Sequence, residues 1–485
     1  MAGSMIGRTT RRTLIGAGVA AGLTGAVGLG TLWLRAGGAL VPGVARARRV
    51  ESDTTLPDQV EVVVVGGGNI GCLTALTLAE RGVPVALCEK GVIAGEASGR
   101  SLGYIDCQFL DAEKLPLIGR TKQLWAELTE RVGAEVGYRA SGIALFCTSQ
   151  DALEGAAHWI ESVKGAPGVD ARILTATEAK ALAGPTTDNL VGAMLEPSDS
   201  IAEPQLVAPA VADAIRRQGG KVFQGCAVRG VETAAGRLAA VVTERGRIRC
   251  RAVVVAGGVW TPLFARSLGI DLPQFMAFSG IVRLDANKGP AIPSITQRGV
   301  VMRPTLQGAC DACAAVGIVP ITPMLLHHAM QMRKVWRQMS DFAGEVRPVL
   351  NLKTFLEEWR IPERWRLDEP SPFEQRRILM PEENTKVLDG VLAGVRASYP
   401  AFNDAHVLER WSGALTSTLD NMPVLSGVEG HPGLYLGSGC YYGLTQGPAA
   451  GEALADLVMG RMPKFDLRPY RLSRFSDGSR LRFHA

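Results

Sequence analysis

The sequence predicts an α/β fold with a buried parallel sheet, and three observations support this prediction. Residues 60–65 form a valine-rich run that leads directly into a glycine-rich turn at 66–71. Residues 72–81 then carry apolar side chains at helical spacing, and residues 83–88 form a second apolar run of strand length. A strand, a helix and a second strand in this order make a βαβ unit, which places two parallel strands in one sheet.

The composition is that of a globular protein with room for two intertwined domains. The chain has 485 residues, of which 47% are hydrophobic and 20% are charged. The formal net charge of +5 is modest and much of its excess lies near the N-terminus, which argues against a nucleic-acid-binding surface. The nine cysteines are scattered and odd in number, so no disulfide framework is expected.

The glycine-rich turn has the spacing of a Rossmann-type dinucleotide-binding motif. Gly66 permits the tight turn, Gly68 lets a pyrophosphate approach the backbone, and Gly71 permits close packing of helix on strand. The helix N-terminus then faces the phosphates. Glu89, 18 residues beyond Gly71, lies where a carboxylate can accept hydrogen bonds from the adenosine ribose. A glycine-rich turn without a ligand is the alternative, but the ordered series of strand, helix, strand and acid favours a dinucleotide.

Two later segments favour FAD over a nicotinamide dinucleotide. Residues 94–100 form a small-residue turn whose backbone amides and Ser98 hydroxyl can bind phosphate and ribityl groups. Residues 253–258 form another buried strand that ends in a glycine pair. Residues 435–439 are a strand that leads into glycines before a helix at 449–459, and they are compatible with a cofactor loop or with an ordinary connection.

The N-terminal segment resembles a twin-arginine export signal. Arg11 and Arg12 precede an uncharged, glycine-rich stretch from Leu14 to Leu34, which has roughly the twenty-residue length that crosses a bilayer. We expect residues 1–35 to form a hydrophobic helix that anchors the protein in a bacterial inner membrane. Export to the periplasm and a disordered tail are the alternatives.

The segments together resemble the D-amino acid oxidase-like superfamily of FAD oxidoreductases, and in particular the bacterial membrane-bound L-amino acid deaminases. The resemblance covers nearly the whole chain in one ordered series of short motifs: residues 78–82, 89–91, 93–96, 242–244, 254–259, 371–374, 411–414, 423–424, 443–445 and 455–457. Together with the glycine-rich turn, it implies these FAD-binding residues: Gly66, Gly68, Asn69, Ile70, Gly71, Glu89, Lys90, Ala97, Ser98, Arg100, Gly103, Val228, Gly257, Gly258, Gly439, Gly443, Leu444 and Thr445.

We therefore expect a discontinuous Rossmann-type FAD-binding domain and an interleaved α+β substrate domain. The FAD-binding domain is expected at 58–135, 190–265 and 400–465, and the substrate domain at 136–189 and 266–399. Residues 322–372 are a candidate membrane-associated insertion, because residues 324–339 show a basic amphipathic helical pattern. Packing of this helix on its own domain is the alternative.

The resemblance implies oxidative deamination of an α-amino acid, with the L enantiomer as the substrate. A neutral amine would lose hydride to the flavin, and the resulting imine would hydrolyse to a 2-oxo acid and ammonia. The protein would contribute mainly by positioning the substrate, so no side-chain base is obligatory. Electrons would then pass to a membrane acceptor such as a quinone or a cytochrome. The alternatives are an amine or secondary amino acid dehydrogenase or oxidase, and a flavoprotein subunit or scaffold with little turnover.

The chain departs from the deaminases at the residue that holds the substrate carboxylate. The deaminases use an arginine on a strand that faces the flavin, and Ala315 occupies that position here. Arg283 or Arg303 is a candidate replacement, whereas Asp311 would favour a cationic group of the substrate. The alternative for Asp311 is a solvated position in the turn after Gly308.

Two tyrosines and two cysteines complete the set of candidate residues. Tyr104 and Tyr442 match family positions near the substrate and are candidate aromatic walls, with ordinary packing as the alternative. Cys310 and Cys313 have CxxC spacing, but no second pair of cysteines or histidines matches it. Two buried thiols are therefore expected instead of a redox pair, and no metal site is predicted.

Overall fold

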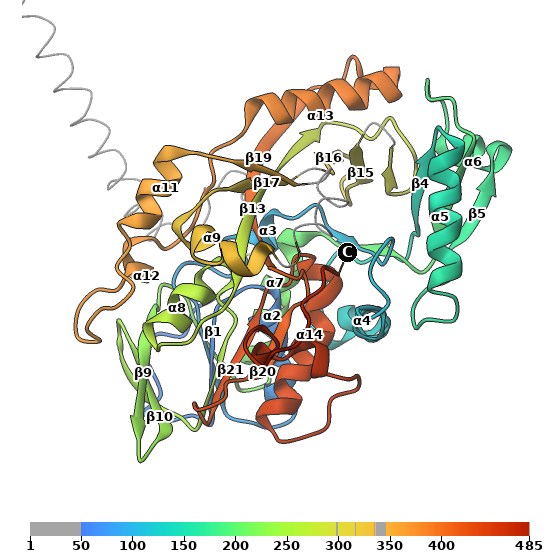
Figure 1. Ribbon diagram of the computed structural model, residues 1–485. Helices are drawn as coiled ribbons and strands as arrows, with labels where there is room; N and C mark the ends of the chain where they lie inside the picture. The colour runs from blue at the N-terminus through green and yellow to red at the C-terminus, as the bar shows by residue number, and fades with distance from the viewer. Residues whose placement is uncertain (1–49, 297–298, 316, 334, 336–345, 485) are drawn as a thin grey trace, which may run out of the picture.

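The computed structural model describes residues 50–484 except 297–298, 316, 334 and 336–345. The predicted N-terminal helix and twin-arginine signal at 1–35 lie outside these described residues. Within them, no helix is both long and apolar enough to cross a membrane. The described chain forms two large sheets, which occupy the lower and upper halves of Figure 1.

The smaller sheet has six strands in the order β20-β21-β12-β1-β2-β8. Five of them are parallel, and β20 pairs antiparallel with β21 at one edge. The strands are β1 (Val62–Val65), β2 (Val85–Cys88), β8 (Lys221–Phe223), β12 (Ala252–Val255), β20 (Val424–Gly427) and β21 (Leu434–Ser438). The central strands are apolar on both faces, as buried parallel strands require, and the predicted α/β sheet is confirmed.

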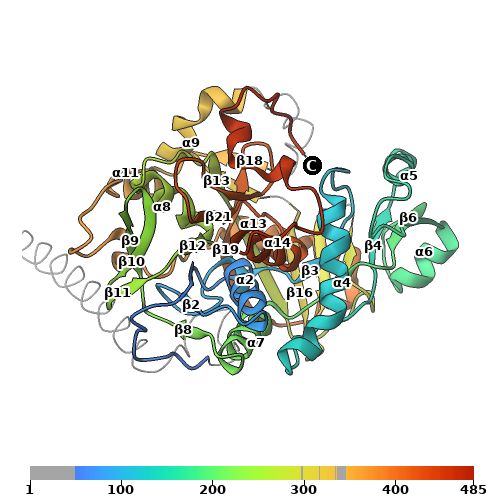
Figure 2. The same cartoon turned by 90° about the horizontal axis from the view of Figure 1, so that it is seen from below.

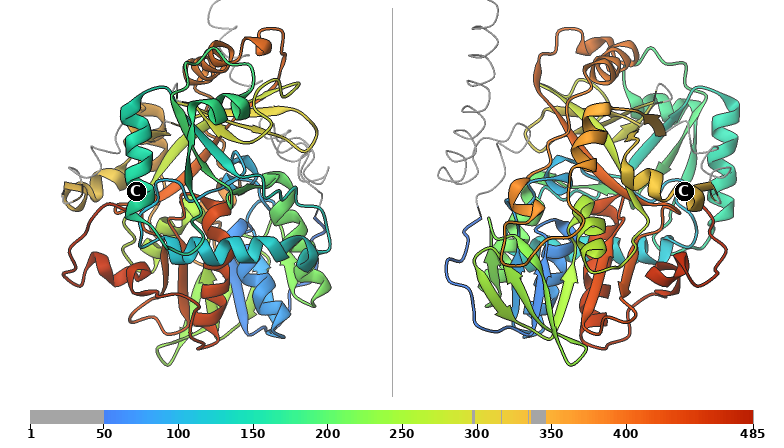
Figure 3. Two further views of the ribbon diagram at one scale, coloured as in Figure 1. Left: turned by 90° about the vertical axis from the view of Figure 1, so that its right-hand side faces the viewer. Right: turned by 60° about the vertical axis from the view of Figure 1, so that its left-hand side comes forward.

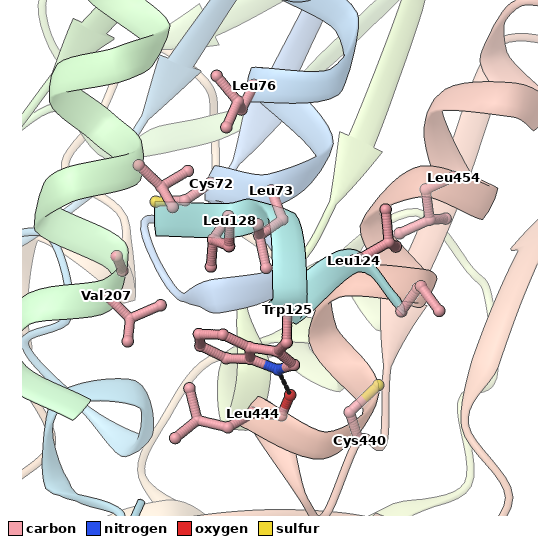
Figure 4. Packing of buried hydrophobic residues seen from close by; sticks show 14 of the residues in the cluster. Cys72, Leu73, Leu76, Leu124, Trp125, Leu128, Val207, Cys440, Leu444 and Leu454 are labelled. Carbon is pink, nitrogen blue, oxygen red and sulfur yellow. Dashed lines mark hydrogen bonds between the residues drawn. The ribbon is translucent and has the colours of Figure 1, made fainter. Parts of the chain in front are cut away.

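A layer of four helices builds the hydrophobic core on one side of this sheet (Figure 4). The helices are α2 (Asn69–Glu80), α4 (Leu115–Val132), α7 (Pro204–Arg217) and α14 (Gly443–Val458). The predicted C-terminal helix begins six residues earlier than expected, because α14 continues through Pro448. Proline lacks an N–H, so the Leu444 carbonyl loses its helical donor. The Trp125 indole donates a hydrogen bond to that carbonyl instead, at 2.9 Å, as Figure 4 shows.

A small antiparallel sheet packs beside the parallel sheet, at the side of the molecule opposite α4 in Figure 2. It contains β9 (Val228–Ala234), β10 (Arg237–Thr243) and β11 (Gly246–Arg249). Together with α8 (Thr261–Ser267), it buries a second apolar cluster that includes Phe223, Val241 and Phe264. Both sides of the parallel sheet are therefore shielded from water.

The larger sheet has ten strands in the order β18-β17-β13-β16-β15-β14-β4-β6-β5, with β19 paired to β13 as well. Figure 3 shows this sheet and its helices above the parallel sheet in both views. Its strands are β4 (Ile143–Cys147), β5 (Arg172–Thr175), β6 (Gly192–Glu196), β13 (Gln274–Leu284), β14 (Ser294–Ile295), β15 (Val300–Pro304), β16 (Cys310–Ala314), β17 (Gly317–Pro320), β18 (Val346–Val349) and β19 (Val407–Thr418). Its helices are α5 (Gln150–Ser162), α6 (Ala176–Ala183) and α13 (Thr385–Ser398).

The sheets divide the chain differently from the predicted domain boundaries at two places. β6 and β19 fall within the segments expected in the FAD-binding domain, 190–265 and 400–465, but both belong to the larger sheet. The physical reason is pairing: β6 runs between β4 and β5, and β19 pairs with β13 over almost its whole length. Both strands therefore cross between the two halves of the fold.

The segment 322–372 projects from the larger sheet next to α8. It contains α9 (Pro323–His327), β18 and α11 (Leu352–Trp359). The single amphipathic helix expected at 324–339 is not continuous, because α9 ends at His327 and a turn follows at His328. Part of the remaining predicted helix lies outside the described residues. The other short elements are α3 (Ala97–Arg100), α12 (Pro372–Gln375), β3 (Tyr104–Ile105) and β7 (Ser200–Ile201).

Candidate FAD and substrate site

The two halves of the fold enclose a cavity of about 450 Å³. The carboxyl ends of β1, β2, β12 and β21 form part of its wall, which is where doubly wound sheets bind ligands. Residues of the larger sheet form another part. The predicted FAD-binding residues that line it are Gly66, Gly68, Asn69, Ile70, Glu89, Lys90, Ala97, Ser98, Arg100, Gly103, Val228, Gly257, Gly258, Gly439, Gly443 and Leu444. Gly71 and Thr445 do not line the cavity, but they contact lining residues.

Glycine is required at two positions of the turn after β1. Gly66 has a φ of +112°, and a Cβ there would lie 2.4 Å from the Ala256 carbonyl oxygen. A Cβ on Gly71 would lie 2.0 Å from the Gly66 carbonyl oxygen. These close approaches bring the first turn of α2 against the end of β1. The Asn69 amide at the start of α2 donates to the Ser98 hydroxyl at 3.0 Å, which joins the 94–100 turn to the same site.

Glu89 joins two backbone amides at the carboxyl end of β2. Its carboxylate accepts hydrogen bonds from the amides of Gly67 and Gly91, both at 2.6 Å. Burial raises the pKa of Glu89, while the nearby Lys90 ammonium and the two amides oppose that rise. The carboxylate lies in the cavity wall at the position that the motif assigns to ribose recognition.

We expect Glu89→Gln to weaken FAD binding about tenfold, because one acceptor oxygen becomes an NH₂ group that faces a backbone N–H. Titration of the apoprotein with FAD, followed by flavin fluorescence, measures the change. Glu61→Gln is the matched control, since Glu61 is 44% exposed in an ion pair with Arg251 and does not line the cavity. Equal dissociation constants for the two variants would contradict the assigned role of Glu89.

The groups around the cavity suit a dinucleotide that carries both phosphates and ring systems. The Asn69 side chain is 3% exposed, and neither polar atom of its amide has a hydrogen-bond partner among the described residues. A buried amide of this kind needs a partner. Glycine backbone at three turns leaves room for close approach, while Glu89 and Ser98 supply polar side chains. These residues fit FAD, which the Gly66 to Glu89 segment would hold at its adenosine and pyrophosphate end.

The comparison with known protein families agrees with this site. The model of the D-amino acid oxidase family, described as FAD dependent oxidoreductase, matches residues 61–457. The chain belongs to this family of FAD-dependent oxidoreductases. The match spans both halves of the fold, so the cofactor-binding segments and the larger sheet are family features together.

Solved structures of L-amino acid deaminases are similar to this FAD-dependent oxidoreductase over most of its length. The deaminase from Proteus myxofaciens, solved in complex with anthranilate, is 32% identical, with a TM-score of 0.84 over 89% of this chain and 97% of the other. The deaminase from Proteus vulgaris is 30% identical, with a TM-score of 0.83 over 88% of this chain and 99% of the other.

More distant curated relatives act on other amines. Glycine oxidase from Geobacillus kaustophilus is 24% identical over 85% of this chain and 97% of its own length. Mitochondrial sarcosine dehydrogenase from Mus musculus is 24% identical over 87% of this chain, which covers only 42% of that longer protein. The protein is thus an FAD-dependent oxidoreductase, as the family match shows.

Both predicted aromatic residues line the end of the cavity that the larger sheet forms. The Tyr104 hydroxyl lies 2.6 Å from the Met302 carbonyl oxygen and 3.1 Å from that of Ser294, and it donates towards these carbonyls. Its ring therefore faces the cavity while its hydroxyl ties β3 to the larger sheet. The Tyr442 ring packs edge-on against Tyr441, with centroids 4.9 Å apart.

The three charged substrate candidates lie together but do not line this cavity. The Arg283 Nε and Nη2 atoms donate to Asp311 at 2.6 and 2.8 Å, and Arg303 donates to Asp311 at 2.9 Å. Arg303 also donates to both carboxylate oxygens of Glu203, at 3.0 and 2.9 Å. These residues form a buried ion cluster. Each arginine thus already has carboxylate partners, so the geometry lends no support to the predicted substrate roles. The alternative for Asp311 is wrong, because Asp311 is buried on β16 and not solvated in a turn.

Cys310 and Cys313 lie on opposite faces of β16, because residues three apart on a strand point to opposite sides. Cys310 packs against α13 with Leu284 and Leu388. Cys313 lines the cavity beside Ile281 and Trp411. Burial raises the pKa of Cys313 to about 12 and that of Cys310 further still. The two thiols are separate and protonated, which agrees with the expectation of two buried thiols.

The sequence did not lead us to predict two polar residues of the cavity wall. Asp106 and Gln108 follow β3 and line the cavity between Tyr104 and Leu110. Neither belongs to a recognisable motif, and their only sequence signal is alternation with Tyr104 along an extended segment. In an extended segment, side chains two residues apart lie on one face. The position of Tyr104 could therefore have been used to predict Asp106 and Gln108 as cavity residues.

Proposed function

We propose that this protein catalyses the oxidative deamination of an amine-bearing small molecule, with an L-α-amino acid as the first candidate substrate. The observation that supports it is the similarity to two L-amino acid deaminases at 30% identity or more over nearly nine tenths of the chain. When bound, the flavin accepts hydride from the carbon next to nitrogen, and the imine that remains hydrolyses to a carbonyl compound and ammonia. The protein orients that C–H bond and excludes water from the cavity.

A second candidate substrate is an amine without a carboxylate. Ala315, which the resemblance aligns with the deaminases' arginine, lines the cavity. Arg283 and Arg303 are held by Asp311 and Glu203, so neither is available without breaking a buried ion pair. A carboxylate clamp needs a bidentate cation. This arrangement supports an amine or secondary amine substrate over a simple amino acid.

Anaerobic mixing with panels of amino acids and amines separates these proposals through bleaching of the oxidised flavin absorbance. Bleaching by L-amino acids but not by their decarboxylated counterparts would support the first candidate. Bleaching by amines alone would overturn it and support the second. If no compound bleaches the flavin, the result would favour the remaining alternative, a flavoprotein subunit or scaffold with little turnover.

We also propose that the electrons pass to a membrane carrier, a quinone or a cytochrome. Apolar side chains are exposed along α9, β18 and α11. Helices α9 and α11 lie near each other in Figure 1. We define the apolar patch as Leu326, Val349, Leu350, Leu352 and Trp359, whose exposed fractions are 54%, 43%, 64%, 65% and 68%. Exposed apolar side chains that gather on a protein surface are typical of an interaction site. It lies in the segment 322–372 that the sequence suggested as a membrane-associated insertion.

A double variant, Leu352→Ser with Trp359→Ser, is expected to slow quinone reduction in membrane vesicles roughly tenfold or more. Both side chains are exposed in the structure, and docking would bury them in the membrane, where full burial of each is worth about 1.5–3 kcal/mol. Anaerobic bleaching by substrate should stay unchanged. Met462→Ser is the control, since Met462 is 91% exposed but lies outside the segment 322–372. An equal loss of quinone reduction in both variants would contradict membrane docking through the apolar patch.

Membrane attachment through the N-terminal segment is a further part of this proposal. Residues 1–35 would anchor the protein in a bacterial inner membrane, with release to the periplasm as the alternative. Carbonate extraction of membranes that carry the full chain distinguishes the two, since an anchored protein stays in the pellet. Replacement of Arg11 and Arg12 by lysine should block export in either case.

A further inference from the structure

The cavity contains a carboxylate at its substrate end. Asp106 follows β3 and lines the cavity near Tyr104 and Tyr442. One carboxylate oxygen accepts a hydrogen bond from the Thr445 hydroxyl at 3.1 Å, and the Asp106 amide donates to the same hydroxyl oxygen at 3.2 Å. Among the described residues, no donor is bonded to the second oxygen. Asp106 is thus held in place by α14 with one oxygen left for a ligand.

Gln108 adds a second acceptor to the same wall. Its Nε2 atom donates to the Ile143 carbonyl at 3.0 Å and to Asp199 at 3.3 Å. A backbone carbonyl can only accept, so it fixes which end of the amide carries the NH₂ group. The Oε1 atom is left without a partner among the described residues, although the side chain is only 7% exposed. A buried acceptor in this state calls for a donor.

Three cations around the cavity have partners of their own. Lys90 pairs with Glu96 at 2.9 Å and lies over the Trp260 ring. Arg100 donates to the carbonyls of Gly95 and Ser412, while its Nη2 atom has no partner among the described residues. Lys122 pairs with Asp199 at 2.8 Å and does not line the cavity. The wall therefore offers the Asp106 carboxylate as an acceptor, and among the described residues no cation forms an ion pair with it, although the Lys122 charge lies near enough to oppose the rise in its pKa that burial causes.

We propose that Asp106 binds a second ammonium group of the substrate, one that is not oxidised. The substrate class is then an amine that carries an additional positive charge, such as an α,ω-diamine or a basic amino acid. The reacting nitrogen must be neutral to release hydride, and a carboxylate beside it would favour its protonated form. Asp106 therefore suits the distant ammonium. This inference rests on the proposed amine oxidation.

Four compounds that share a five-carbon chain, two of them with an added carboxylate, test the inference on the full-length holoenzyme. L-Lysine and 1,5-diaminopentane carry the distant ammonium, whereas L-norleucine and pentylamine lack it. L-Lysine and L-norleucine carry the carboxylate, and the other two lack it. The concentration that half-bleaches the flavin under anaerobic conditions is measured for each compound. We expect L-lysine to bleach the flavin at a concentration roughly 30-fold lower than L-norleucine, and 1,5-diaminopentane at one roughly 30-fold lower than pentylamine. A desolvated charge pair contributes a difference in affinity of this size.

Asp106→Asn assigns that preference to one side chain. It keeps the acceptor for Thr445 but removes the charge, so the 30-fold preference should disappear while the flavin spectrum stays that of the holoenzyme. Asp106→Glu should restore part of the preference. Asp404→Asn is the control, because Asp404 is exposed and does not line the cavity.

The outcomes separate this inference from the proposed function. Equal bleaching by charged and uncharged partners, or a preference that survives in Asp106→Asn, overturns the role of Asp106 but leaves amine oxidation standing. If Asp106→Asn fails to hold FAD, the four compounds on the unaltered protein still decide whether a second positive charge is required. A flavin that none of the compounds, and no other amine or amino acid, bleaches overturns the proposed function and this inference with it.

Discussion

Replacing Gly71 by alanine is expected to abolish FAD binding and to destabilise the protein by more than about 3 kcal/mol, above the usual cost of overpacking. The new Cβ would lie 2.0 Å from the Gly66 carbonyl oxygen. The Gly66 backbone cannot move away from this Cβ. Its amide donates a hydrogen bond to the Cys88 carbonyl at 2.9 Å, and its α-carbon already faces the Ala256 carbonyl. The helix must move instead, and with it the amides that would face the phosphates.

The ratio of flavin to protein absorbance after purification measures the first effect, and denaturant unfolding of the apoprotein measures the second. Gly155→Ala is the matched control, since Gly155 is also inside a helix but a Cβ there would meet nothing within 4 Å. Alanine at that position should stabilise the protein by about 0.5–1 kcal/mol through helix propensity. Normal FAD content in Gly71→Ala would show that α2 can shift without loss of the cofactor site.

The cofactor half of the site was predictable because its determinants are local. The strand, turn and helix from 62 to 80 are contiguous in sequence, and the close approach that requires Gly71 lies within that segment. Glu89 follows from the length of one helix and one strand. The same logic located the strands at 252–255 and 434–438, which pair side by side in the structure. Short-range geometry is enough for such a prediction.

The substrate half was not predictable in this way, because strand register and long-range pairing decide it. Asp311 on β16 is paired with Arg303 on the neighbouring strand β15 and with Arg283 on the neighbouring strand β13. Sequence spacing alone left each of them as a substrate contact. β6 and β19 similarly join the larger sheet through partners that are distant in sequence: β6 pairs with β4 at separations of 45 to 53 residues, and β19 pairs with β13 at separations of 123 to 144 residues.

Asp311→Asn is expected to destabilise the protein by about 3–5 kcal/mol, a large share of the 5–15 kcal/mol by which domains are stable. The carboxylate accepts three hydrogen bonds from Arg283 and Arg303, whose side chains are 5% and 0% exposed. An amide offers one oxygen and places an NH₂ group against a guanidinium. Arg283 keeps only a 3.4 Å contact with Glu409, so its charge stays buried with little compensation.

Unfolding in urea, followed by tryptophan fluorescence, measures this loss, and Glu161→Gln provides the comparison. Glu161 pairs with Lys164 at the surface, where both side chains are 72% exposed, so its loss should cost between 0 and about 1 kcal/mol. A structural ion cluster predicts that Asp311→Asn lowers stability while the substrate concentration that half-bleaches the flavin stays unchanged in the folded fraction. If Asp311→Asn instead has normal stability but altered substrate preference, the result would show that Asp311 contacts the substrate. Arg283 and Arg303, which bind Asp311, would then be candidate substrate residues again.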